Sequence, residues 1–187
     1  MDSPFVVGFI TGFALVVVLV IVTYNRLVRL RNRVQNAWSD VDVQLKRRHD
    51  LVPSLVETVR GYMTHERQTL EAVTSARAQA ISAGANIGAR AVAETALTGA
   101  VGNLFAVAER YPTLRAAQNF TLLQEQLTST ENRIAFARQY YNESVLQYNT
   151  TVATFPRNVV AGAMGFSAAK LFAAEPGDKT NIAVKVN

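Results

Sequence analysis

A run of four basic or imidazole side chains, Lys46 to His49, stands within an apolar helical pattern and just before Pro53. On a helix, four consecutive residues cover just over one turn, so these side chains point in different directions. We favour a solvated helix face, because acidic neighbours could neutralise the charges: Asp40, Asp42 and Asp50. An acidic protein partner or anionic lipid remains an alternative. Nucleic acid is not expected as a partner, because that surface would need more basic residues interleaved with stacking aromatics, and Trp38 falls on the apolar seam.

Other residues that could do chemistry do not complete a known motif. His65-Glu66 begins like a zinc-protease box, but no histidine follows four positions after His65. The glycines of "GANIGAR" lack both the P-loop lysine and the dinucleotide-binding spacing. The sequence has no cysteine, which excludes disulfides, thiolate zinc sites and cysteine nucleophiles. We therefore predict no catalytic, cofactor-binding or metal-binding residue, and no cofactor.

A dense polar group, Thr130-Glu131-Asn132-Arg133, interrupts a helix that is otherwise apolar along one side. Two interpretations stay open at this point. The group could form hydrogen bonds and ion pairs between helices, or it could be a recognition surface.

The first 25 residues are expected to anchor the chain in a membrane. No charged side chain occurs from Ser3 to Asn25, and at about 1.5 Å per residue this stretch spans about 34 Å, enough for a hydrocarbon core of about 30 Å. A cleaved signal peptide would have positive charge before the apolar run, whereas here Asp2 precedes it. Residues 1–25 are therefore interpreted as a retained transmembrane anchor.

Four arginines follow the apolar run directly: Arg26, Arg29, Arg31 and Arg33. Basic residues beside a membrane span stay on the cytoplasmic side, so we expect the N-terminus outside and the body of the protein on the cytoplasmic side. The same four arginines are candidate ligands of anionic lipid headgroups. The net charge of +5 agrees with an anionic partner.

After the anchor, apolar residues recur every three or four positions, which indicates long helices. The first stripe of apolar residues, which we call the seam, begins at Leu27, is kinked at Pro53 and continues to Arg77. Further helices are expected at 93–111 and about 119–154, with a shorter one within 159–172. The predicted fold is all-α: one transmembrane helix continuing into an antiparallel bundle of three long helices plus a short one, over residues 26–172. The tail, 173–187, is either disordered or a pairing strand.

The unequal lengths of these helices predict a self-association surface. If the first helix outlasts the third, part of its seam next to the membrane has no partner within the chain. Leu30, Val34 and Trp38 would then be exposed, and an exposed stripe with a tryptophan is a typical association site. We therefore expect homo-oligomers through these three residues.

Several blocks, among them "YNRLVRLRNRVQNAWSDVDVQLKRRHDLVPSLVETV", "TENRIAFARQYYNESVLQYN" and "FPRNVVAGAMGF", resemble the LemA family over about Tyr24 to Phe172. The resemblance implies a bacterial protein with one N-terminal membrane helix and a bundle of long helices. A relative in that family participates in magnetosome membrane formation, and the family supplies no catalytic residues to transfer.

Together with the resemblance, these observations favour a membrane-anchored, non-enzymatic helical scaffold at the bacterial inner membrane. We expect it to self-assemble or recruit unidentified protein partners, in the organisation or remodelling of that membrane. A membrane-tethered regulatory or sensory adaptor is the alternative. An enzyme is the least supported, because no convergent polar constellation of the kind that catalysis needs is evident.

Overall fold

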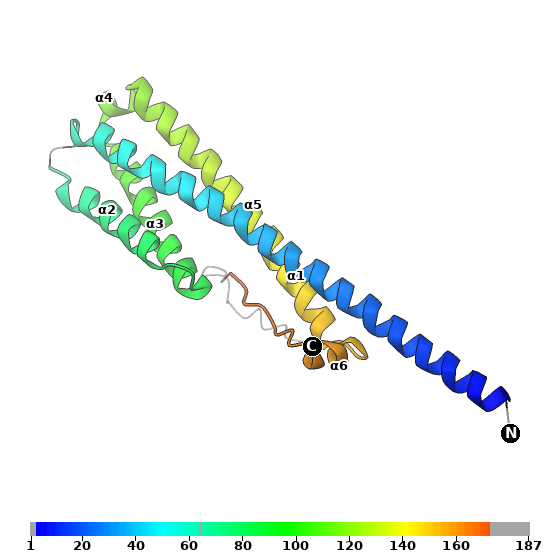
Figure 1. Ribbon diagram of the computed structural model, residues 1–187. Helices are drawn as coiled ribbons and strands as arrows, with labels where there is room; N and C mark the ends of the chain where they lie inside the picture. The colour runs from blue at the N-terminus through cyan, green and yellow to red at the C-terminus, as the bar shows by residue number, and fades with distance from the viewer. Residues whose placement is uncertain (1–2, 64, 173–187) are drawn as a thin grey trace, which may run out of the picture. The chain divides into compact units, whose positions relative to one another are not determined.

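The computed structural model describes residues 3–63 and 65–172, and every regular element in them is an α-helix (Figure 1). The elements are α1 (Ser3–Arg60), α2 (Arg67–Ser82), α3 (Ile87–Ala108), α4 (Pro112–Arg115), α5 (Gln118–Ala153) and α6 (Arg157–Ala163). The predicted all-α class is confirmed. The expected tail, 173–187, lies outside the described residues.

Helix α1 is one continuous helix of 58 residues, and Pro53 lies inside it. The prediction that the same seam continues to Arg77 is wrong, because α1 ends at Arg60. There the backbone N–H groups of Tyr62 and Met63 both donate to the carbonyl oxygen of Val59, at 3.0 Å, and the chain turns. Met63 is buried immediately after this turn, so burial of its side chain fixes the reversal. Helix α2 is therefore a separate element.

The other helix boundaries follow local signals. Asn86 caps α3: its side-chain oxygen accepts the backbone N–H groups of Gly88 and Ala89, at 3.1 and 3.2 Å. Pro112 opens α4, at a position where a missing N–H costs nothing. Helix α5 agrees with the predicted 119–154 to within one residue at each end.

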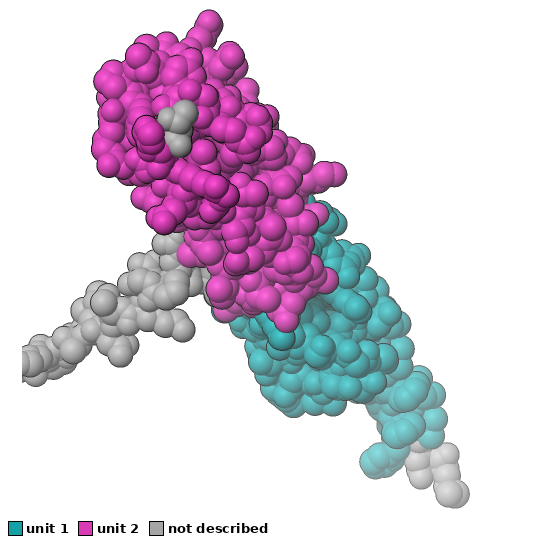
Figure 2. All heavy atoms as spheres, turned by 90° about the vertical axis from the view of Figure 1, so that its left-hand side faces the viewer, with its two compact units in different colours: residues 1–41, 137–170 teal, residues 42–136, 171–187 magenta. Residues whose placement is uncertain are grey.

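The described chain divides into two compact units, coloured separately in Figure 2. Unit 1 comprises the described residues of 1–41 and 137–170, and unit 2 comprises 42–136 with Leu171 and Phe172. Helices α1 and α5 each contribute to both units.

The core of unit 2 is an apolar cluster to which α1, α2, α3, α4 and α5 all contribute. Phe105 of α3 and Phe120 of α5 meet edge to face, with ring centroids 6.0 Å apart. The members of this core are Val52, Leu55, Val56, Val59, Met63, Val73, Ala76, Ala80, Leu97, Val101, Leu104, Ala108, Leu114, Phe120 and Leu127.

Unit 1 is built on an antiparallel contact between α1 and α5. Trp38 packs against Tyr141 with ring centroids 5.3 Å apart, and Arg33 Nη1 donates to Gln147 Oε1 at 2.8 Å. Residue numbers that rise along one helix fall along the other, as antiparallel packing requires.

An extended segment, 166–170, lies along α5 and completes unit 1. Tyr148 Oη donates to the carbonyl of Ser167 at 2.9 Å, and Tyr141 Oη donates to that of Lys170 at 2.7 Å. Asn149 both donates to the carbonyl of Ala169 and accepts its N–H. These side chains of α5 replace the backbone partners that a strand would supply, so the segment is held without a sheet.

Helix α6 is joined to this segment by a glycine turn. Gly165 has φ +72°, in the left-handed region, and the N–H of Phe166 donates to the carbonyl of Ala161 at 2.9 Å. This is the helix-terminating arrangement that favours glycine, because a side chain at that φ would be strained. The turn brings Phe166 back to Tyr24 of α1, with ring centroids 5.8 Å apart.

Candidate functional site

The N-terminal part of α1 is apolar and uncovered, as a membrane span would be. Between Phe5 and Val22 its large side chains are exposed or, at Val20, half-buried, whereas Thr23 and Leu27 are buried within unit 1. Among the described residues, α3 is also long and apolar enough to cross a membrane. Its apolar side chains contribute to the core of unit 2, however, so α3 is explained as a core helix. The candidate span is therefore the first part of α1.

The four predicted headgroup ligands lie directly after this span, and all four side chains are exposed: Arg26, Arg29, Arg31 and Arg33. Arg29 donates to the backbone carbonyl of Asn25 at 3.3 Å, one turn earlier on the same helix. Arg26 and Arg33 also line a shallow groove of about 540 Å³ on unit 1, together with Arg157. Its other lining residues are mostly hydroxyl- and amide-bearing, and include Ser144, Gln147, Thr150, Thr151 and Thr154. The structure therefore adds a further cation, Arg157, to the predicted set.

The predicted association stripe is not exposed in the single chain. Leu30 and Val34 are buried within unit 1, and Trp38 is half-buried against Tyr141. The expectation that this stripe lacks a partner within the chain is wrong. Because α1 ends at Arg60, its portion after the span is nearly as long as the 36-residue α5. Association through this stripe stays a prediction, and it would now require Leu30 and Val34 to leave their places in unit 1.

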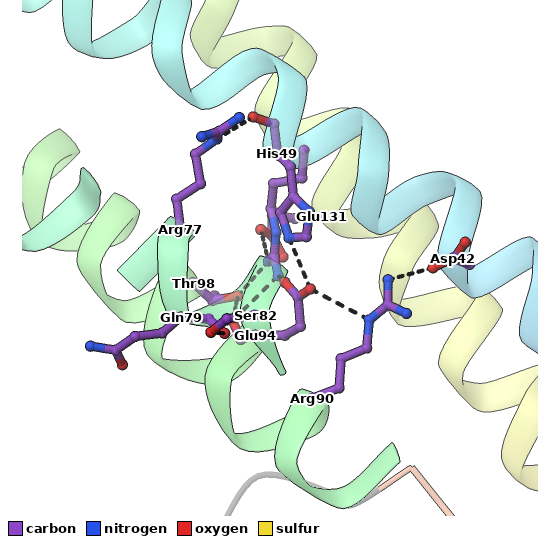
Figure 3. Close-up of polar contacts among 10 residues, drawn as sticks. Asp42, His49, Arg77, Gln79, Ser82, Arg90, Glu94, Thr98 and Glu131 are labelled. Atoms are coloured by element: carbon purple, nitrogen blue, oxygen red, sulfur yellow. Dashed lines mark hydrogen bonds and ion pairs between the residues drawn. The ribbon is translucent and has the colours of Figure 1, made fainter. Parts of the chain in front are cut away.

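A buried polar cluster in unit 2 is the main constellation that the structure brings together: Arg48, His49, Glu94, Thr98 and Glu131 (Figure 3). Arg48 is only 1% exposed. Its Nη1 donates to Thr98 Oγ1 at 2.7 Å and forms an ion pair with Glu131 Oε1, while its Nη2 forms an ion pair with Glu94 Oε2. One guanidinium thus joins α1 to α3 and α5 at once.

His49 satisfies the second oxygen of Glu94. Its Nε2 lies 2.9 Å from Glu94 Oε1, and because an ionised carboxylate only accepts, Nε2 carries the proton and donates. Burial alone would raise the pKa of Glu94, but the hydrogen bond from His49 and the charge of Arg48 together hold that pKa below its usual value. Glu94 is therefore a carboxylate at neutral pH.

Further contacts extend the cluster outward. Arg90 forms an ion pair with Asp42, and its Nε lies 4.0 Å from Glu94 Oε1 (Figure 3). Arg77 of α2 donates to the backbone carbonyl of His49 at 2.7 Å. All four helices α1, α2, α3 and α5 therefore contribute to one network.

The structure corrects the interpretation of the Lys46–His49 run. Lys46 and Arg47 are exposed, as predicted, but Arg48 and His49 are buried. The signal was present in the sequence, because the apolar seam skips from Leu45 to Val52. Seven residues are two helical turns, so the helix has an inward-facing position one turn after Leu45. Arg48 and His49 stand there in place of an apolar residue. Of the two interpretations of residues 130–133, the structure supports contacts between helices for Glu131, which pairs with Arg48.

The cluster is suited to holding helices together and not to acid–base chemistry. Glu94 receives donors on both oxygens, and its side chain is only 4% exposed, so no substrate atom reaches it. Within residues 3–63 and 65–172, no group of three or more His, Cys, Asp or Glu side chains could hold a metal ion. We interpret the cluster as a structural element.

A candidate membrane span followed by a bundle with a buried ion network defines the class: a membrane-associated, all-helical protein. The chain belongs to the LemA family, whose sequence model matches residues 37–187.

Two magnetosome proteins and a LemA protein are among its relatives. "Magnetosome protein MamQ 2" of Paramagnetospirillum magneticum is 26% identical over 184 residues, covering 85% of this chain and 68% of that protein. "Magnetosome protein MamQ" of Magnetospirillum gryphiswaldense is 25% identical with the same coverage. "Protein LemA" of Metamycoplasma hominis is 23% identical over 158 residues, covering 84% of this chain and 72% of that protein.

Proposed function

We propose that this protein is a non-enzymatic helical scaffold, anchored in the bacterial inner membrane, that assembles with its own copies or recruits protein partners there. The relatives named as magnetosome proteins support a role in organising a membrane compartment. In this proposal the N-terminus lies outside and the bundle lies in the cytoplasm, as the arginines after the span favour.

The observation that carries the proposal is the unbroken course of α1. A single helix begins in the exposed apolar stretch and continues into the packed residues Leu27 and Val41 without a loop. A flexible tether would merely hold a soluble domain near the membrane. A continuous helix instead joins the span to the bundle without a flexible linker. This suits a scaffold, because a partner bound to that helix is held in a fixed position relative to the membrane.

The buried polar cluster supports the same proposal. Its carboxylates and its imidazole are used in contacts between helices, so they stabilise the bundle and are not available for a reaction. The exposed arginines after the span supply the membrane-facing chemistry, since each basic residue near an anionic surface contributes about 1 kcal/mol of attraction.

The test is the size of the assembly. Full-length protein is extracted from its native membranes in a mild detergent, and its mass is measured by light scattering with the detergent contribution subtracted. We expect a particle larger than the 20.4 kDa chain, containing copies or captured partners that cross-linking in intact membranes also joins. A monomer without partners at micromolar concentration, in detergent and in membranes, would refute the scaffold and favour the sensory adaptor.

A further inference from the structure

Three large apolar side chains are exposed around the turn between α5 and α6: Phe155, Val159 and Met164. Their exposed fractions are 77%, 63% and 52%. We refer to these three residues as the turn patch. Val160 and Ala161, in the same short helix, are buried, so α6 already has a packed face and the turn patch is a second apolar surface.

Contacts within unit 1 place the end of α6 near the point on α1 where the exposed apolar stretch ends and the packed part begins. The glycine turn after α6 brings Phe166 against Tyr24, and Thr23 beside it is buried, whereas the side chains of α1 before Thr23 are exposed or half-buried. Tyr24 lies at the end of the uncharged run from Ser3 to Asn25, at the depth where amphipathic rings are favoured. The α5–α6 turn therefore lies at the level of the membrane surface.

Charged side chains accompany the turn patch at the same level. Arg26 of α1 and Arg157 at the start of α6 line one groove. Apolar side chains beside basic ones are the combination that interfacial membrane segments use: apolar groups enter the boundary between headgroups and acyl chains, and cations bind lipid phosphates.

We propose that the α5–α6 turn is a second membrane contact, in which the turn patch inserts into the interfacial layer beside the span while Arg26 and Arg157 bind the phosphates of anionic lipids. This inference rests on the proposed anchoring by α1 and goes beyond it. The span alone fixes only one helix. A second contact on the C-terminal side of unit 1 fixes which side of the bundle faces the bilayer.

The experiment uses the absence of cysteine from the sequence. Single substitutions Phe155→Cys and Val159→Cys are labelled with an environment-sensitive fluorophore in the full-length protein. The protein is reconstituted into vesicles of phosphatidylethanolamine and phosphatidylglycerol that contain nitroxide-labelled lipids, with the nitroxide shallow or deep. Phe136→Cys is the matched control, because Phe136 is 73% exposed and lies on α5 about 25 Å before the end of that helix at Ala153. Val16→Cys reports the span itself.

We expect the labels at 155 and 159 to be quenched more by shallow than by deep nitroxides, the label at 136 to be unquenched, and the label at 16 to be quenched by deep ones. Unquenched labels at 155 and 159 beside a quenched label at 16 would overturn this inference and leave the anchor intact. An unquenched label at 16 would refute the anchor itself. A label at 155 that is shifted to the blue but unquenched would show that protein, such as a second copy, covers the patch.

A charge variant tests the phosphate contact separately. Arg157→Gln should reduce the preference of the turn for nitroxide-labelled phosphatidylglycerol over phosphatidylcholine by up to about fivefold. Arg133→Gln, which removes an exposed arginine from unit 2, should leave that preference unchanged. Equal effects of the two substitutions would overturn the assignment of Arg157.

Discussion

Replacing Arg48 with methionine removes the cation at the centre of the buried polar cluster and keeps a long, flexible side chain in its place. Glu94, whose side chain is 4% exposed, would lose its ion pair with Arg48. It would retain the hydrogen bond from His49 and the longer contact with Arg90, whose Nε lies 4.0 Å from Glu94 Oε1. Glu131 and Thr98 would each lose a charged donor. The substitution therefore leaves a buried carboxylate without its main counter-charge.

The expected cost is large because the remaining charge is buried. Removing one partner of a buried ion pair costs about 3–5 kcal/mol, since the other partner stays out of water uncompensated. For a chain of this size, each kcal/mol lowers the melting temperature by about 2–4 °C, so Arg48→Met should lower it by about 6–20 °C. The double variant Arg48→Met/Glu94→Gln should be more stable than the sum of its single effects predicts, because no unpaired charge remains.

The assay is unfolding of the full-length protein in detergent, by heat and by urea, followed by far-ultraviolet circular dichroism. Arg47→Met is the control, because it makes the same chemical change at the adjacent, exposed residue and should alter stability by no more than about 0.5 kcal/mol. If Arg48→Met is as stable as Arg47→Met, the guanidinium does not hold the helices together and the structural interpretation of the cluster fails.

Three further predictions follow from the same structure. Because the pKa of Glu94 is below its ordinary value of 4.5 in the folded state, its contribution to stability is present above that pH and is lost as the pH falls through the folded value. The stability difference between the wild type and Glu94→Gln should therefore narrow in acid, and a constant difference would contradict the assigned contacts. Leu127→Asp, at a buried position of α5, should cost about 3 kcal/mol or more, whereas Leu122→Asp at an exposed position of that helix should cost little; equal urea midpoints would show that α5 does not pack as described. A C-terminal alkaline phosphatase fusion should be inactive and a fluorescent protein fusion bright, and the reverse pattern would place the bundle outside the cytoplasm.

The sequence predicted those elements in which an apolar pattern has one interpretation. The span could be predicted because an uncharged apolar run as long as Ser3 to Asn25 is uncommon in water-soluble proteins. Helix α5 could be predicted from its apolar stripe and from Pro156 after its end. The break after Arg60 was missed because the seam was continued from Tyr62 to Leu70, eight positions later, across the polar stretch from Thr64 to Thr69. Periodicity does not reveal whether a chain with the correct spacing stays straight or turns and begins again.

The buried cluster was missed for a different physical reason. Basic residues are usually solvated, so Arg48 and His49 were assigned to an exposed face together with Lys46 and Arg47. Their burial depends on Glu94 and Glu131, which lie more than forty residues away and on different helices. Only the tertiary arrangement shows that these charges meet. The expected exposure of Leu30, Val34 and Trp38 was wrong because it was derived from a first helix that was taken to be longer than α1 is.

The continuity of α1 also fixes a rotational phase between the lipid-facing side chains and the packed ones. Each residue of an α-helix adds about 100° of rotation and 1.5 Å of rise. One alanine inserted between Tyr24 and Leu27 would therefore turn every side chain of the span by about 100° around the axis relative to Leu27, while moving it hardly at all in depth. Seven inserted alanines would nearly restore the angle and shift the span by about 10 Å. Insertions of different length thus separate the rotation of the span about its axis from its depth in the membrane. They test whether the direction in which the span faces its lipid and protein neighbours matters to the cell.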